Sequence, residues 1–323
     1  MTPDSRVYVA GHRGMVGSAL LRALVSNGYG NILTRSHDEL DLIDGAAVSR
    51  FFDRERPHVV LLAAAKVGGI RANDAFPADF VRDNLAIQTN VIHAAWRAGV
   101  EQLLFLGSSC MYPRDCSQPI KEEYLLTGPP EVTNRSYAIA KIAGLEMCSA
   151  YNRQHGTRFV CVVPASVYGP GDNYDLESGH VFAALIRKFH EARVHGNKVT
   201  VLWGTGAPRR EFIHADDLAA ACKYLLELPH ERLAAFPQPL VNVGMGSDLT
   251  VADLAHRIAA IVGSDCKIEW DTTKPDGTPQ KLLDVSRLDA LGWRPTIGLD
   301  EGIRHAYRDF LMSRPTAAVD PPN

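Results

Sequence analysis

Short aliphatic runs alternate with longer amphipathic segments through the first half of the chain. The runs are typical of buried parallel strands, and the segments between them repeat apolar residues at helical spacing. The predicted strands are residues 6–10, 31–34, 59–62, 102–107 and 159–163, and the predicted helices are 16–27, 45–56, 81–98 and 137–155. This alternation predicts βαβ units, and therefore an α/β fold with a Rossmann-type, doubly wound parallel sheet.

After Pro164 the pattern changes, because residues 168–179 are rich in Gly, Pro, Asp and Asn and predict a long functional loop. Further elements are predicted beyond it: helices 180–192, 216–227 and 250–262, and strands 198–203 and 240–243. We predict two units. Residues 1–165, with returning segments at about 212–245, form a dinucleotide-binding domain. Residues 166–211 and 246–315 form a smaller α/β substrate lobe, and 316–323 a disordered tail.

The composition is that of a globular protein, with 46% hydrophobic and 22% charged residues among 323. A net charge of −3 gives no reason to expect nucleic acid or an anionic membrane as partner. The start of the chain has no basic, apolar leader, and no apolar run is long enough to span a bilayer, so we expect a cytoplasmic protein. The six cysteines form no C-x-x-C pair, and no metal site is expected.

A glycine-rich turn follows the first predicted strand. Gly11, Gly14 and Gly17 form a G-x-x-G-x-x-G variant of the dinucleotide fingerprint, between that strand and a helix. Glycines permit the tight turn and close approach to a pyrophosphate, while the helix N-terminus offers amide donors. The expected cofactor contacts in this turn are Gly11, Arg13, Gly14, Met15, Val16 and Gly17.

The end of the second predicted strand indicates which dinucleotide binds. An acid there would hold the ribose diol of NAD, whereas a cation accommodates the extra phosphate of NADP. Here Arg35 stands at that point and no acid occurs until Asp38, while Arg13 adds a second cation. NADP(H) is therefore expected; the alternative is that Arg35 is only a solvated surface charge.

A phenol and an ammonium, Tyr137 and Lys141, lie four residues apart and hence on one face of a predicted helix. The ammonium is expected to favour phenolate, which would make proton donation to a developing alkoxide feasible near neutrality. Ser108 follows the fourth predicted strand, at the edge where a parallel sheet presents its ligand site. In this order, glycine turn, serine and Tyr/Lys pair predict nicotinamide-dependent carbonyl chemistry.

These motifs resemble those of the extended short-chain dehydrogenase/reductases, and more narrowly the GDP-L-fucose synthase family. That family performs 3,5-epimerisation and NADPH-dependent 4-keto reduction of GDP-4-keto-6-deoxy-D-mannose. The stretches that carry the resemblance span nearly the whole chain: AGHRGMVG (10–17), AAAKVGGI (63–70), LFLGSSCMYP (104–113), YAIAKIAG (137–144), REFIH (210–214) and PDGTPQKLLD (275–284).

The resemblance implies specific roles. Ser108, Tyr137 and Lys141 would form the reduction centre, and Cys110 and His180 would be the base and acid of epimerisation. His37, Pro164, Tyr137 and Lys141 would join the cofactor contacts, and a homodimer is expected. The implied substrate contacts are Lys188, Trp203, Arg210 and Lys281. Without the family, Cys110 would read as a core cysteine, His180 as a polar residue at a helix start, and Trp203 equally well as a core aromatic.

Departures from the family pattern surround the sugar. Ser166, Gly179 and Lys188 stand where relatives commonly carry Asn, Ser and Arg. A related GDP-4-keto-6-deoxy sugar such as a heptose, reduced with or without epimerisation, is therefore the alternative substrate. A non-catalytic nucleotide-binding regulator is a third hypothesis, which an intact Ser108, Tyr137 and Lys141 argues against.

Overall fold

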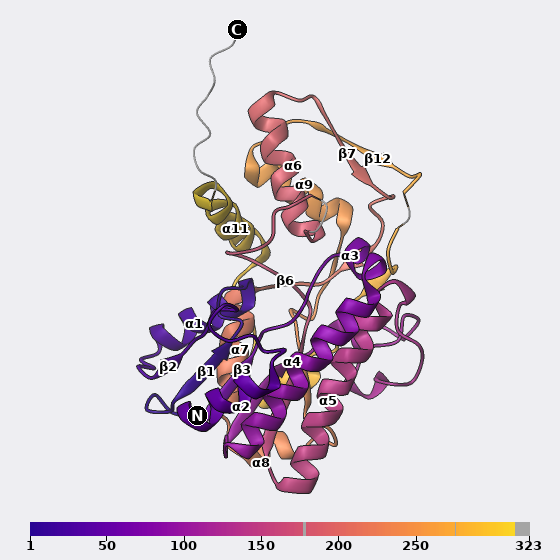
Figure 1. Ribbon diagram of the computed structural model, residues 1–323. Helices are drawn as coiled ribbons and strands as arrows, with labels where there is room; N and C mark the ends of the chain where they lie inside the picture. Colours follow the sequence, from indigo (N-terminus) through magenta and orange to yellow (C-terminus); the bar gives the residue numbers. More distant parts are fainter. Residues whose placement is uncertain (177–178, 275, 314–323) are drawn as a thin grey trace.

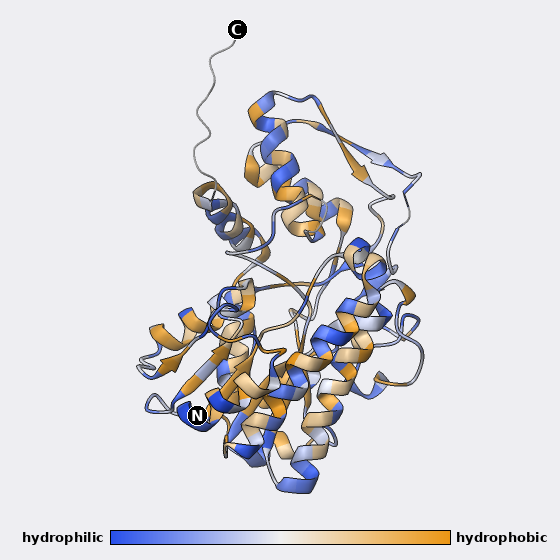
Figure 2. Ribbon diagram, in the orientation of Figure 1, coloured by the Kyte–Doolittle hydropathy of each residue, from blue (hydrophilic) through white to orange (hydrophobic). Residues whose placement is uncertain are grey.

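The computed structural model describes residues 1–176, 179–274 and 276–313 (Figure 1). Its centre is a parallel sheet of six strands in the order β10-β5-β4-β3-β1-β2. The bounds are β1 Val7–Ala10, β2 Ile32–Leu33, β3 Val59–Leu62, β4 Gln102–Leu106, β5 Arg158–Pro164 and β10 Leu240–Val243. Strands β1 and β3 are buried throughout, as both faces of a parallel sheet must be when helices cover them. In Figure 2 the central strands are coloured mostly as hydrophobic.

The strand order reverses at β1. Helix α1 (Met15–Ser26) leads from β1 to β2 at one edge, and the chain then returns to place β3 on the other side of β1. Because crossovers of this type are right-handed, the reversal puts α1 on one face of the sheet and the helices between β2 and β5 on the other. The expected doubly wound Rossmann-type fold is confirmed. Ligands of such sheets bind at the carboxyl ends of the strands beside the reversal.

The helices of this domain form two groups. Helix α1 packs against α7 (Ala215–Glu227). On the other side α4 (Pro77–Arg97) packs against both α2 (Gly45–Glu55) and α5 (Arg135–His155). Two short helices, α3 (Ile70–Ala75) and α8 (His230–Ala234), and the 3₁₀ turns Ser109–Met111, Glu122–Tyr124 and Val132–Asn134 complete the domain's connections.

The second lobe has a core of its own, above the large sheet in Figure 1. Helices α6 (Val181–His195), α9 (Val251–Val262) and α11 (Leu299–Ser313) build it together with the parallel pair β7 (Val199–Trp203) and β12 (Lys267–Asp271). Two small sheets connect the lobe to the domain: β6 (Ser166–Tyr168) pairs with β9 (Phe212–His214), and β8 (Arg209–Arg210) lies between β11 (Leu249–Thr250) and β13 (Gln280–Lys281).

Most predicted elements occur, and the differences have local causes. Helix α4 begins at Pro77, earlier than predicted, because proline suits the first helical turn. The pattern did not predict α3, α8 or α11. It also did not predict α10 (Ser286–Leu291), whose Leu288 and Leu291 pack with Leu283 in the core of the larger domain. We therefore propose adding residues 283–293 to the dinucleotide domain.

The predicted tail, 316–323, lies outside the described residues. Among the residues that the structure does describe, no helix combines the length and apolarity needed to cross a membrane.

Candidate functional site

The glycine turn after β1 is a close-packed structure that tolerates no side chain. Gly11 has φ +85°, and a Cβ on it would lie 2.6 Å from the backbone nitrogen of Ala64, at the end of β3. A Cβ on Gly17 would lie only 2.0 Å from the carbonyl oxygen of Gly11. The turn thus sits at the strand reversal and requires glycine at both positions.

Helix α1 begins in this turn without a side-chain cap. Gly14 is its N-cap residue and offers no side-chain acceptor, and the first helical turn contains no acid. The amides of Met15, Val16 and Gly17 therefore lie in the part of a helix that binds anions. Gly171, from the loop after β6, lies against the start of α1, where a Cβ on it would be 3.7 Å from the Met15 Cα. The residues present fit the pyrophosphate of a dinucleotide.

Two cations stand at the tips of β1 and β2. Arg35 lies over the ring of Phe51, 5.3 Å from its centroid, and donates to Glu55 at 2.9 Å, so it is held in place rather than freely solvated. Arg13 is exposed in the glycine turn. Both charges help to lower the pKa of Glu39, whose carboxylate mainly accepts from Ser36, and this places them in one neighbourhood. His37 is exposed beside this neighbourhood, and Pro164 ends β5.

The Tyr/Lys pair lies beside the end of β4. The Lys141 ammonium is buried, donates to the carbonyl oxygen of Leu106 at 2.8 Å, and lies 5.8 Å from the centroid of the Tyr137 ring. Burial lowers the pKa of Lys141 to about 8. Burial, with the nearby Cys110, raises the pKa of Tyr137, while a hydrogen bond with Ser108 lowers it. The expected phenolate is thus not favoured here, and Tyr137 holds its proton as an acid must before donating it.

Cys110 lies in the 3₁₀ turn that follows β4, half-buried rather than in the core. Ser108 caps this turn, and its hydroxyl accepts from the Cys110 amide at 3.2 Å. Two donors contact the sulfur: Nδ2 of Asn134 at 3.1 Å, and Nζ of Lys281 at 3.8 Å. The structure therefore brings Ser108, Cys110, Tyr137 and Lys281 to one place.

His180 is the N-cap residue of α6 in the substrate lobe. Its side chain does not cap the helix, and the ring stays partly exposed. The surrounding protein nevertheless lowers the pKa of His180 by removing solvent from the ring. No hydrogen bond joins it to Ser108, Cys110 or Tyr137 in the described part of the chain.

The residues expected to bind substrate lie on neighbouring elements of the lobe. Arg210 on β8 pairs in register with Lys281 on β13. Lys188 on α6 donates to the carbonyl oxygen of Val201 at 3.1 Å, two residues before Trp203 on β7. Burial lowers the pKa of both Lys188 and Arg210, and Asp276 partly offsets this for Arg210. Arg210 and Lys281 thus place two cations side by side, as an anionic ligand would require.

Two residues that the sequence analysis did not identify, Arg71 and Asn134, also lie in this region. Trp203 is 53% exposed, so it is not a core aromatic, and the guanidinium of Arg71 stacks on it with its carbon 4.5 Å from the ring centroid. Arg71 lies on α3 of the other domain, so the stack bridges the two units. Asn134 is the second of these residues, and it donates to the Cys110 sulfur. Neither carries a local sequence signal, because both contacts depend on segments far away in the chain.

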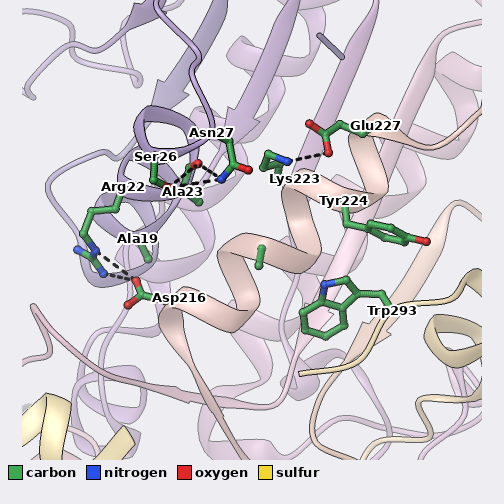
Figure 3. Close-up of a pocket in the computed structure, with 11 residues that line it drawn as sticks. Ala19, Arg22, Ala23, Ser26, Asn27, Asp216, Lys223, Tyr224, Glu227 and Trp293 are labelled. Atoms are coloured by element: carbon green, nitrogen blue, oxygen red, sulfur yellow. Dashed lines mark hydrogen bonds and ion pairs between the residues drawn. The ribbon is translucent and has the colours of Figure 1, made fainter. Parts of the chain in front are cut away.

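A separate surface pocket lies between α1 and α7 (Figure 3). None of the predicted site residues lines it. Its charged groups pair with one another: Arg22 with Asp216 at 2.5 Å, and Lys223 with Glu227 at 2.8 Å. These pairs leave the pocket with no free charge for a ligand, and we assign it no role.

Comparison with known proteins agrees with this geometry. The model of the NAD dependent epimerase/dehydratase family matches residues 7–244. The chain belongs to that family. GDP-L-fucose synthase 1 of Arabidopsis thaliana is 51% identical over 310 residues, which cover 96% of this chain and 94% of the relative. GDP-L-fucose synthase of Escherichia coli (strain K12) is 50% identical over 312 residues, which cover 96% and 97%.

Within the family the chain thus groups with the GDP-L-fucose synthases, as its motifs predicted. A solved structure of the GDP-mannoheptose C4 reductase from Campylobacter jejuni, with NADP bound, is also similar. It is 37% identical and has a TM-score of 0.88, and the match covers 96% of this chain and 99% of that one. The proteins similar to this chain therefore include enzymes named for different sugars.

Proposed function

We propose that this enzyme converts GDP-4-keto-6-deoxy-D-mannose into GDP-L-fucose by epimerising C3 and C5 and then reducing the C4 ketone with NADPH. The observation that carries the proposal is the convergence of Ser108, Tyr137 and the Cys110 sulfur at the end of β4. The identity of about 50% to two GDP-L-fucose synthases over nearly the whole chain favours the mannose-derived hexose over a heptose.

Epimerisation needs a base and an acid acting on opposite faces of the sugar. The C4 ketone acidifies the hydrogens on C3 and C5. Cys110 is the base: the C–H bond breaks, the proton passes to sulfur, and the electron pair moves to the ketone oxygen as an enolate. Ser108 and Tyr137 stabilise that oxygen by hydrogen bonds. His180 returns a proton from the other face, and its lowered pKa makes the imidazolium a stronger donor.

Reduction uses the same oxyanion site. NADPH, when bound, supplies the hydride that reaches C4. Tyr137 then donates its phenolic proton to the alkoxide oxygen, and Ser108 holds that oxygen in line with the phenol. The Lys141 ammonium, close to the Tyr137 ring, stabilises the phenolate left behind.

NADP(H) as the specific cofactor is part of this proposal. Arg13 and Arg35 supply positive charge at the tips of β1 and β2, where an adenosine 2′-phosphate requires it. The similar reductase from Campylobacter jejuni was solved with NADP bound. Arg35→Ala should raise the Kd for NADPH and leave that for NADH nearly unchanged. An equal loss for both cofactors would remove Arg35 from the phosphate site.

The experiment that tests the function is incubation with the keto-sugar nucleotide in heavy water, first without NADPH. Deuterium entering C3 and C5, read by NMR, is expected, and Cys110→Ser should lose most of it. With NADPH added, the product should be GDP-L-fucose. Absence of NADPH oxidation with this ketone, together with turnover of a GDP-4-keto-6-deoxy-heptose, would establish the alternative substrate. NADPH binding with no turnover of either ketone would establish a regulator.

A homodimer that forms through α4 and α5 is our proposal for the assembly. These paired helices carry a ring cluster in which Trp96 stacks on His155 at 4.3 Å and His93 contacts the Tyr151 hydroxyl at 2.7 Å. Light scattering on the purified protein should give twice the chain mass of 35.3 kDa. A cytoplasmic location remains a prediction from the sequence.

A further inference from the structure

Asn134 stands at a position where its side chain would normally cap a helix. It is the N-cap residue of α5, the helix that carries Tyr137 and Lys141, yet it makes no side-chain cap hydrogen bond. Asparagine is among the preferred N-cap residues because its oxygen accepts from the first free amides. In this chain Asp44 shows the ordinary arrangement, accepting from the amides of Ala46 and Ala47 at the start of α2.

The Asn134 side chain instead turns towards the reaction centre. Its Nδ2 donates to the Cys110 sulfur at 3.1 Å, and its Oδ1 is buried with no hydrogen-bond partner among the described residues. The 3₁₀ turn that leads into α5 is capped by Glu131 instead, which accepts from the amide of Thr133. An amide oxygen that is buried and unpaired destabilises the fold. A side chain that incurs this cost beside a nucleophilic sulfur points to a role in function.

We propose that Asn134 is a positioning residue for epimerisation, an inference that rests on the proposed function. Its amide N–H and the Lys281 ammonium both contact the Cys110 sulfur, and such donors stabilise a thiolate base. Asn134 thus holds the base in place for the proton transfer.

Two substitutions test this role. Asn134→Ala removes the N–H donor, whereas Asn134→Asp replaces the donor with an anionic oxygen of similar shape. Deuterium exchange into C3 and C5 without NADPH should fall about 10- to 100-fold in Asn134→Ala, as expected for one hydrogen bond to a charged group. It should fall further in Asn134→Asp, because the carboxylate repels a thiolate.

The products give a readout that a purely structural role would not change. Hydride transfer depends on Tyr137 and Lys141, which neither variant touches. If enolisation slows while reduction continues, more ketone is reduced before inversion, so both variants should yield a larger share of non-epimerised sugar. A uniform loss of exchange and reduction by the same factor would overturn the proposal, because it would show that Asn134 only supports the site as a whole.

Asp44→Ala is the matched control, since it removes an N-cap residue that does cap. It should lower Tm while exchange and product ratio stay at wild-type values. The Asn134 variants should keep Tm close to wild type because no cap is lost. Exchange at the wild-type rate in both Asn134 variants would overturn the inference. If the wild-type protein showed no exchange at all, the proposed function would fail instead.

Discussion

Replacing Lys141 with methionine should abolish ketone reduction and yet stabilise the protein without its cofactor. Lys141 is 3% exposed, and burial lowers its pKa from 10.5 to about 8. At pH 7 the folded protein therefore carries a buried ammonium whose desolvation costs about 3 kcal/mol, taking roughly 1.4 kcal/mol per pKa unit. Methionine fills a similar volume without a charge.

Part of this gain is offset by a lost contact. The ammonium donates to the Leu106 carbonyl oxygen at 2.8 Å, and losing that hydrogen bond costs about 1 kcal/mol. The net expectation is a variant about 2 kcal/mol more stable than wild type at pH 7. The folded-state pKa is depressed, so the wild-type protein regains stability as pH rises through about 8 towards 10.5. The difference in unfolding free energy between the variant and wild type should narrow by roughly 1.4 kcal/mol between pH 7 and 9.

Urea denaturation of the cofactor-free protein at both pH values measures this gap. Lys267→Met is the control, because that side chain is 72% exposed, and its difference from wild type should not change with pH. A gap for Lys141→Met that stays constant from pH 7 to 9 would refute the reasoning. So would a variant less stable than wild type at pH 7.

Three further outcomes are expected. Gly17→Ala should abolish NADPH binding in a fluorescence titration, since its Cβ would lie 2.0 Å from the Gly11 oxygen, whereas Gly30→Ala, with nothing within 4 Å, should bind normally. Burial raises the pKa of Glu211 to about 7, so the stability that it contributes is lost as pH rises through that value. In urea denaturation, the unfolding free energy of wild type should fall by up to about 3 kcal/mol relative to that of Glu211→Gln between pH 5 and 8. A difference that stays constant with pH would contradict this. Arg71→Ala should raise the KM for the keto-sugar nucleotide and leave NADPH affinity unchanged, because Arg71 stacks on Trp203 in the substrate lobe; an unchanged KM in steady-state kinetics would argue against it.

The sequence alone determined the features that depend on local geometry. Gly11 and Gly17 were identifiable because a tight turn between strand and helix admits no Cβ. Tyr137 and Lys141 were paired correctly because residues four apart share a helix face, and Ser108 was placed because parallel strands share a carboxyl edge. Each of these inferences uses periodicity or a spacing of a few residues.

Only the tertiary structure decided what surrounds the Cys110 sulfur. Lys281 lies 171 residues away and reaches it because β13 pairs with β8 in the register that sets Lys281 opposite Arg210. Asn134 is 24 residues away, at the start of α5, and nothing in the local sequence indicates its contact with sulfur. Strand register and side-chain direction across such separations depend on packing of the whole chain, and no local pattern encodes them.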